Sequence, residues 1–258
     1  MSNTNSWPQF VSGLLIVGCG SVTVPEQCDL SSRAIYYGSS VAPIAFASGE
    51  PLAIGALQDE AGNTLCSAVM VAPHWALTVA HCEATARLFF AVQINKAQSK
   101  PVQVAEVAYT VLQEQTPLAL MKLETLALSQ ALPVRPIGLY EGEPAEGWLG
   151  VDVTLAGFGQ TEVGTRGQLR FTQTPVVDAD DTTIRVDGGG VTGACQGDSG
   201  GPLLAEQAGA ARVVGVLQSG SRNCLGTDTY VRAWRQASWI EEVTGERVCG
   251  SHVTVADR

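Results

Sequence analysis

The chain contains the loop sequence Cys195-Gln196-Gly197-Asp198-Ser199-Gly200-Gly201-Pro202-Leu203, in which three glycines surround one serine and an aspartate precedes it. Glycine adopts positive φ and lets a backbone approach a ligand closely, so a serine in such a loop presents its hydroxyl beside backbone N–H groups. This arrangement suits a nucleophile for acyl transfer. The alternative, from these residues alone, is a glycine-rich turn before an apolar strand.

A serine nucleophile needs a base, most often histidine. The chain has three histidines. His252 lies in a polar tail, and His74 follows Pro73 in a predicted exposed turn. We therefore expect the base to be His81, which ends an apolar run.

Short apolar runs alternate with turn residues along most of the chain, which predicts an all-β barrel or sandwich. The expected strands of the first half cover residues 51–57, 67–71, 76–80, 88–92, 102–107 and 118–123. Those of the second half cover residues 151–159, 167–171, 183–186, 201–204 and 212–217. Apolar residues at helical spacing predict one helix over residues 234–243, and Gly245 ends it.

The apolar run of residues 10–17 is too short to span a membrane and is typical of an export signal over residues 1–19. Leu15 to Cys19 loosely resembles a bacterial lipobox, in which Cys19 carries the lipid. No Lys or Arg precedes it, which an upstream start codon would explain, and a buried N-terminal strand is the alternative. Residues 20–34 read as a linker or propeptide.

The chain has seven cysteines and a formal net charge of −10. If Cys19 is lipidated, six cysteines remain, and an even number in an exported protein suggests three disulfides. The negative charge argues against a nucleic-acid partner, because phosphate contacts need clustered Lys and Arg.

Two segments carry a family resemblance. Residues 66–82, which include His81, resemble the base-bearing segment of trypsin- and chymotrypsin-like serine proteases, and residues 194–203 resemble the nucleophile segment. Residues 155–159 resemble the Gly-aromatic-Gly that opens the second barrel of the family. The likeness runs from about residue 35 to residue 243, and we expect a bacterial exported member. It implies two packed six-stranded antiparallel β-barrels with a short C-terminal helix.

The resemblance also implies the domain organisation and the roles of several residues. We expect the N-terminal barrel over residues 35–140, the second over residues 141–233, and the helix and tail over residues 234–258. Ser199 is then the nucleophile, His81 the general base, and the N–H groups of Gly197 and Ser199 the oxyanion hole. The implied disulfides are Cys66–Cys82 and Cys195–Cys224, and by elimination we pair Cys28 with Cys249.

Asp198 has a separate role in the family, where it forms an ion pair with a freshly cut N-terminus. Ile35-Tyr36-Tyr37-Gly38 resembles that new terminus, although the usual sequence is Ile-Val-Gly-Gly and Ala34 precedes the cut in place of a basic residue. The resemblance therefore implies activation by cleavage after Ala34.

The third member of the catalytic triad is missing. The family places an aspartate where this chain has Pro117, and the nearest acid is Glu114. Proline has no acceptor side chain and fixes φ. Three interpretations remain: Glu114 reaches the histidine through an altered loop, the enzyme is weak, or the domain is a pseudoprotease that binds without cutting.

The substrate pocket implied by the resemblance includes Gly193 at its base, Gly220 on one wall and Asp228 near a second wall. Gly193 replaces the aspartate of trypsin-like specificity, and Asp228 is positioned to attract Lys or Arg side chains. The alternative for Asp228 is an exposed acid in the loop of residues 226–229.

The leading hypothesis is an exported serine endopeptidase, lipid-anchored at a bacterial cell envelope or secreted, acting on peptides or proteins as a monomer. Its rivals are a catalytically silent binding module and a lipoprotein scaffold without a cleft function. Membrane contact is expected only through the lipid. No metal-ligand cluster or phosphate loop is visible, so we expect no metal and no cofactor.

Overall fold

The computed structural model describes residues 35–83, 87–92, 103–124 and 134–248. The chain divides into two units, Met1–Leu30 and Ser31–Arg258, and every described residue belongs to the second. The predictions for the export signal, the propeptide, Cys19, Cys28 and Cys249 lie outside the described residues. Within the described part of the chain, no helix is long and apolar enough to cross a membrane.

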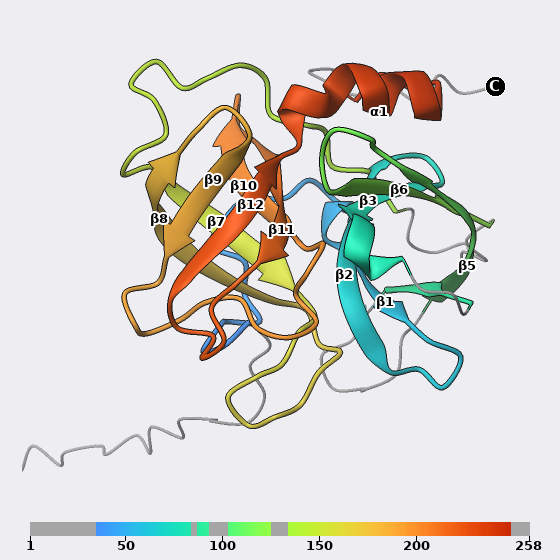
Figure 1. Cartoon of the computed structure of the whole chain (residues 1–258), viewed down its shortest axis with the longest axis horizontal. Helices are drawn as coiled ribbons and strands as arrows, with labels where there is room; N and C mark the ends of the chain where they lie inside the picture. The colour runs from blue at the N-terminus through green and yellow to red at the C-terminus, as the bar shows by residue number, and fades with distance from the viewer. Residues whose placement is uncertain (1–34, 84–86, 93–102, 125–133, 249–258) are drawn as a thin grey trace, which may run out of the picture. The chain divides into compact units, whose positions relative to one another are not determined.

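The first barrel consists of six antiparallel strands that close in the order β1-β2-β3-β6-β5-β4 (Figure 1). Their bounds are β1 Ile54–Gln58, β2 Thr64–Ala72, β3 Trp75–Val79, β4 Phe89–Val92, β5 Gln103–Leu112 and β6 Leu118–Leu123. The short helix η1 (Glu50–Ala53) leads into β1, and η2 (Ala80–Cys82) follows β3. Strands β2 and β3 are almost wholly buried, which explains their continuous apolar sequence.

The second barrel closes in the order β10-β11-β12-β9-β8-β7, also antiparallel. Its bounds are β7 Asp152–Gly157, β8 Arg170–Ala179, β9 Thr183–Asp187, β10 Pro202–Gln207, β11 Ala210–Ser219 and β12 Thr227–Arg232. The two six-stranded barrels and the short helix after them confirm the predicted fold.

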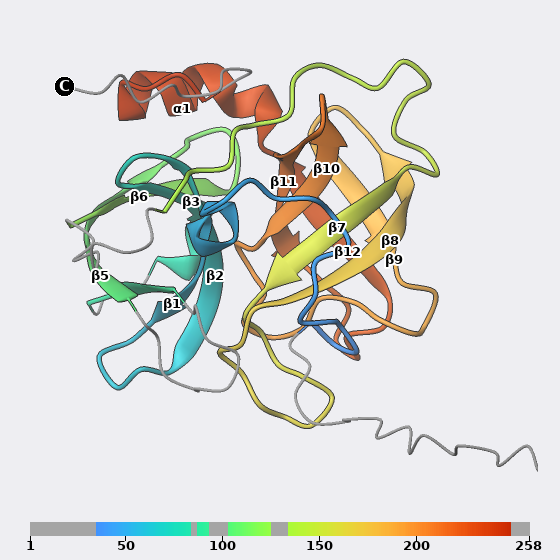
Figure 2. The same ribbon diagram turned by 180° about the vertical axis from the view of Figure 1, so that it is seen from behind.

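The barrels lie side by side in both opposite views (Figures 1 and 2). One apolar cluster fills the first barrel and extends to Phe158, Leu204 and Val216 of the second half. A separate cluster around Leu155 and Tyr230 fills the second barrel. The continuous cluster fixes one barrel against the other, so loops from both halves can form one site.

The C-terminal helix α1 (Ala237–Thr244) begins three residues later than predicted, because the turn η3 (Trp234–Gln236) precedes it. Ile240 is its fully buried residue and joins the apolar cluster of the first barrel. The helix ends at Gly245, whose φ of 71° is the left-handed conformation that commonly ends helices.

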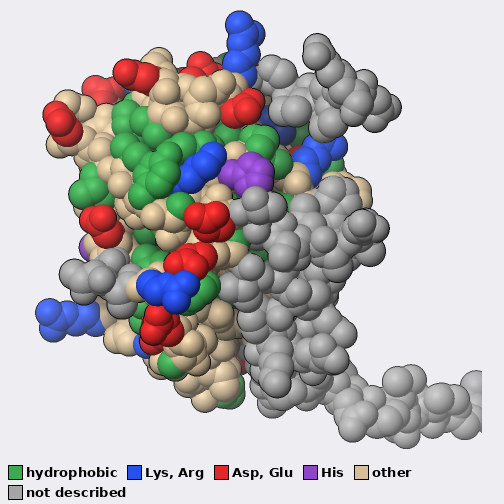
Figure 3. All heavy atoms as spheres, turned by 90° about the vertical axis from the view of Figure 1, so that its right-hand side faces the viewer, with side chains coloured by type: hydrophobic (Ala, Val, Ile, Leu, Met, Phe, Trp, Pro, Cys, Tyr) green, Lys and Arg blue, Asp and Glu red, His purple; other side chains and the backbone are tan. Residues whose placement is uncertain are grey.

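Charges of both signs mix on the surface of the first barrel. On the part of this face that Figure 3 shows in colour, acidic, basic and apolar side chains are interspersed. The described residues of this face therefore present no broad basic patch of the kind that phosphate contacts require.

Candidate active site

The Ser199 loop lies between β9 and β10 and is folded tightly on itself. The Asp198 N–H donates to the Cys195 carbonyl at 3.0 Å, and the Gly201 N–H donates to the Asp198 carbonyl at 2.8 Å. Gly200 has a φ of 82°, and a Cβ there would lie 2.2 Å from the Ser67 carbonyl oxygen of the first barrel. Only glycine allows this approach, so the contact with the other barrel requires glycine at position 200.

Two backbone donors at Ser199 have no partner among the described residues. The N–H groups of Asp198, Gly200 and Gly201 all donate within the loop or to β11. Within the described residues, the N–H groups of Gly197 and Ser199 donate no hydrogen bond. The loop therefore offers two unused donors next to the hydroxyl, as stabilisation of a developing oxyanion requires.

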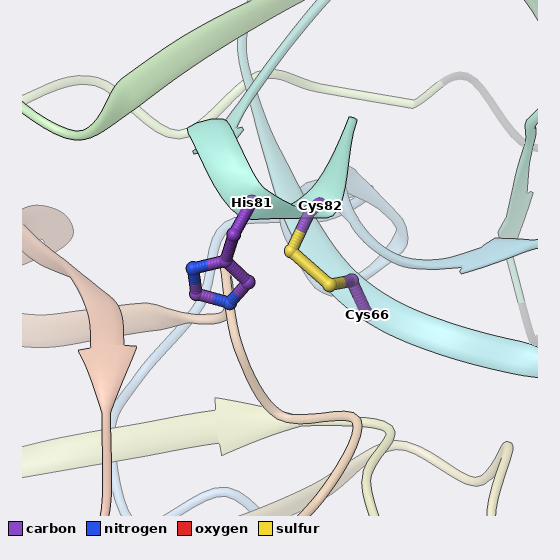
Figure 4. A group of neighbouring side chains, drawn as sticks. All are labelled: Cys66, His81 and Cys82. Carbon is purple, nitrogen blue, oxygen red and sulfur yellow. A yellow bond between two sulfur atoms is a disulfide. The ribbon is translucent and has the colours of Figure 1, made fainter. Parts of the chain in front are cut away.

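The segment that carries His81 contacts the Ser199 loop from the first barrel. It lies in η2, directly after β3, and its ring extends beside the Cys66–Cys82 disulfide (Figure 4). The Cys82 Sγ is 3.6 Å from the Ser199 carbonyl oxygen, and the Ser67 N–H donates to that oxygen at 2.8 Å. The fold thus brings the predicted base and nucleophile to the junction of the barrels, where neither side chain makes a hydrogen bond within the described residues.

The group formed by Cys66, His81 and Cys82 has ligand atoms that lie within 4.8 Å of one another. Both sulfurs belong to the disulfide, and metal binding needs the free thiolate. The group is therefore a covalent link that fixes the segment carrying His81.

Pro117 offers a backbone carbonyl near His81 and no acceptor side chain. The Pro117 carbonyl accepts from the Ala80 N–H at 2.9 Å, one residue before His81. Glu114 is exposed, and the turn around it is closed by the Gln113 side chain, which accepts from the backbone N–H of Gln115. In the described part of the chain, no carboxylate is hydrogen-bonded to His81.

Asp198 is buried beneath the loop. Its carboxylate accepts from the N–H groups of Gly159 at 2.7 Å and Cys195 at 2.9 Å. Burial raises the pKa of Asp198 to about 7; the two N–H groups and Arg166 lower it, and Asp228 raises it further. The carboxyl group therefore lacks a cationic partner close enough to offset its desolvation.

The three predicted pocket residues lie together. Asp228, on β12, is 1% exposed, and its Oδ2 accepts from the Ala194 N–H at 2.7 Å. A Cβ on Gly220 would lie 2.5 Å from Asp228 Oδ1, and a Cβ on Gly193 would lie 3.2 Å from Oδ2. Burial raises the pKa of Asp228 to about 7, against the lowering effect of backbone N–H groups. Asp228 is thus a strand residue between the two glycines, and the alternative of an exposed loop acid is wrong.

The second predicted disulfide, Cys195–Cys224, joins the Ser199 loop to the segment after β11. Both pairings implied by the resemblance are therefore confirmed. Ile35 is 1% exposed and packs in the second barrel, and the adjacent Tyr36 N–H donates to the Gly193 carbonyl at 2.9 Å.

Ser67 is a site residue that the sequence analysis missed. Its hydroxyl donates to the Gly197 carbonyl and accepts from the Phe158 N–H, both at 2.9 Å. Its carbonyl accepts from the Thr78 hydroxyl at 3.0 Å. The available signal was a pair of hydroxyl residues inside two otherwise apolar strands, since buried polar groups generally have partners.

A family model described as Trypsin matches residues 45–240. The chain belongs to the trypsin family. Among its relatives, this trypsin-family chain is 28% identical over 204 residues to an "Uncharacterized peptidase" of Corynebacterium glutamicum, a match that covers 72% of this chain and 66% of that protein. It is 34% identical over 174 residues to "Serine protease 56" of Mus musculus, which covers 57% of this chain and 28% of that protein.

A solved structure of HL collagenase is similar to this trypsin-family chain in fold, with a TM-score of 0.63 and 20% identity. The likeness covers 80% of this chain and 99% of that one. The relatives are named as a peptidase and a serine protease, and the matches span 66% and 28% of their own lengths. The two disulfides among the described residues are typical of exported proteins.

Proposed function

We propose that the chain is a serine endopeptidase that acts through an acyl-enzyme on Ser199. The Ser199 Oγ attacks the scissile carbonyl, and His81 accepts the hydroxyl proton and then gives it to the leaving amine. Water, activated in the same way, releases the acyl group. The observation that carries this proposal is the pair of unused N–H donors, Gly197 and Ser199, beside a serine held against the segment that carries His81.

We expect the turnover to be low. The aspartate absent at Pro117 normally holds the histidine tautomer and stabilises the imidazolium. Its loss costs about 10⁴ in turnover in the general case for this family, while about 10³–10⁴ over the uncatalysed rate remains from the other groups. The oxyanion donors and the pocket supply that remainder here.

Pro117 also favours a second function, a catalytically silent module that binds a peptide or protein segment in the same cleft. In that case the Ser199 hydroxyl is one polar group of a binding surface. Replacing Ser199 by alanine then leaves binding unchanged and removes no activity.

A fluorophosphonate probe separates the two functions. The segment before Ile35 is replaced by the recognition site of a specific protease, so that the cut exposes Ile35, and mass spectrometry verifies the new terminus. We expect the probe to label the cut protein and not its Ser199→Ala variant, while the exposed-serine control Ser39→Ala is labelled normally. No labelling of the verified cut protein would contradict the peptidase and leave the binding module.

For the substrate, we propose that Asp228 selects Lys or Arg on the acyl side of the scissile bond. Its Oδ1 is buried without a hydrogen bond within the described residues, and it faces the position of Gly220. A cationic side chain inserted between Gly193 and Gly220 gives this oxygen a partner and restores the ionised form that burial disfavours.

Activation by a cut before Ile35 is part of the proposal. In the uncut chain Ile35 has a φ of 51°, a region that β-branched residues avoid at a cost of roughly 1–2 kcal/mol. A new N-terminal residue has no preceding carbonyl, so the cut removes this constraint. It also creates an ammonium group on Ile35, the residue before Tyr36, whose N–H donates to the Gly193 carbonyl. We expect this ammonium to pair with the buried carboxyl of Asp198, as the family resemblance implies.

We propose in addition that the protein is exported and anchored through lipid on Cys19. The motif before this cysteine and the two disulfides support export. Cys19→Ser is expected to move the protein from the membrane fraction to the soluble fraction, and an unchanged distribution would remove the anchor from the proposal.

A further inference from the structure

A cavity of about 500 Å³ lies where the β1–β2 hairpin meets the segment after β7. Its polar lining includes Gln58, Asn63, Thr64, Gln160 and Arg166, with Phe158 among its apolar lining residues. Cavities of this size are typical of small-molecule sites, and such a volume is more than a single side chain needs. Residues of both halves line this cavity, whereas Gly193, Gly220 and Asp228 all belong to the second half.

The cavity adjoins the Ser199 loop through short contacts. The backbone N–H of the lining residue Phe158 donates to the Ser67 hydroxyl, and this hydroxyl donates to the Gly197 carbonyl. The lining residue Arg166 donates to the Gln196 Oε1 at 2.6 Å, and Gln196 directly precedes Gly197. A polypeptide whose scissile carbonyl rests at Ser199 is therefore within reach of this cavity.

The position of the cavity relative to Gly193, Gly220 and Asp228 decides which part of a substrate it can meet. Under the proposed function the acyl-side residue binds at Gly193, Gly220 and Asp228 of the second barrel. The cavity is lined in part by Thr64 of β2, the strand whose Ser67 N–H donates to the Ser199 carbonyl. A chain that crosses Ser199 from the first pocket continues toward the barrel junction.

Arg166 gives this cavity its charge. It is the one charged side chain among the residues that line it, and it is exposed. Its guanidinium contacts the amide oxygens of Gln196 and Gln160, the latter at 3.4 Å. Among the described residues, no carboxylate lies within ion-pair distance of it, so a ligand carboxylate can replace a neutral amide as acceptor.

We propose that this cavity binds an acidic substrate side chain on the leaving-group side of the scissile bond, and that Arg166 selects it. The proposal rests on the proposed function, because that function defines which side leaves. The methylene groups of a Glu or Asp side chain would contact the apolar wall, and its carboxylate would pair with the Arg166 guanidinium.

The test measures binding without catalysis, on the Ser199→Ala protein. Fluorescent peptides blocked at both ends carry one Lys before the scissile bond and either Glu or Gln at the first, second or third position after it. At one of these positions the Glu peptide is expected to bind about fivefold more tightly than the Gln peptide at low salt, the upper range for an exposed ion pair. Added Arg166→Gln is expected to abolish this difference.

Arg247→Gln is the matched control, since Arg247 is exposed after α1 and the substitution removes the same charge. It is expected to keep the preference for Glu. Equal affinities for Glu and Gln at all three positions, or an equal loss in both arginine variants, would overturn the proposal. Selective binding with no probe labelling of Ser199 would instead contradict only the peptidase function.

Discussion

Pro117 is the residue on which the catalytic rate depends most directly. Its carbonyl accepts a hydrogen bond from the Ala80 N–H, which fixes the backbone next to His81. What His81 lacks is an acceptor side chain. We expect Pro117→Asp to raise turnover of a peptide substrate by roughly 10²–10⁴, because the carboxylate fixes the imidazole tautomer and stabilises the imidazolium. Steady-state kinetics on the cut protein measure the gain.

Pro117→Ala is the control for that change, since it releases the proline ring without adding an acceptor. Its turnover is expected to stay near that of the natural chain. An equal gain in the alanine and aspartate variants would show that backbone freedom, and not the carboxylate, limits the reaction.

At Asp228 the expected effect is on substrate choice. Asp228→Asn keeps the shape of the side chain and removes the charge, so the preference for Lys over Leu before the scissile bond is expected to fall by about tenfold or more. The control is Asp181→Asn, because the Asp181 side chain is 94% exposed. The ratio of kcat/KM for paired peptides reports the change, and an unchanged ratio would remove Asp228 from the pocket.

The sequence alone does not decide whether Asp228 is a pocket residue or an exposed loop acid, and the reason is physical. Thr227–Arg232 begins with three polar residues and follows Gly226, so its sequence indicates a turn, yet the segment pairs with both β9 and β11. Burial of an isolated carboxylate is rare, and only the surrounding N–H donors make it acceptable. Those donors become visible only in three dimensions.

Among the secondary-structure elements, β2 links the two halves of the site. Ser67→Ala is expected to lower the free energy of unfolding by about 2 kcal/mol, because the buried Gly197 carbonyl and Phe158 N–H each lose a partner. Urea denaturation measures the loss. The exposed Ser39→Ala variant is expected to change little, and equal stability of the two variants would show that the Ser67 hydroxyl does not hold the loop.

Strands that are buried on both faces were the easiest elements to predict. The runs that became β3 and β6 were placed within one residue of their ends, since continuous apolar sequence marks a wholly buried strand. The strand β8 was expected to end at residue 171 but continues to Ala179, past Pro175 and Asp178. Beyond residue 171, Thr174 is buried and Val177 is exposed, so the polarity of the sequence does not follow the burial of the strand.

Taken as a whole, the uncut molecule contains two buried carboxyl groups whose pKa values are about 7, Asp198 and Asp228. Their ordinary value is 3.8, so between about pH 4 and about pH 7 the folded state holds more protons than the unfolded state. The free energy of unfolding therefore falls as pH rises through this range. A cut before Ile35 is expected to lessen the fall, because an ammonium near Asp198 lowers its pKa.

Variants separate these carboxyl groups from the rest of the protein. Thermal unfolding of the uncut chain at about pH 4.5 and about pH 7.5 is expected to show a smaller loss of stability in Asp228→Asn, which has no charge to bury. Asp180→Asn is the control: backbone N–H groups lower the pKa of Asp180, so it stays ionised throughout this range and its removal shifts both measurements alike. An equal loss of stability between the two pH values in all three proteins would mean that Asp228 ionises as freely in the folded state as in the unfolded state. Burial of Asp228 would then add nothing to its attraction for a bound cation.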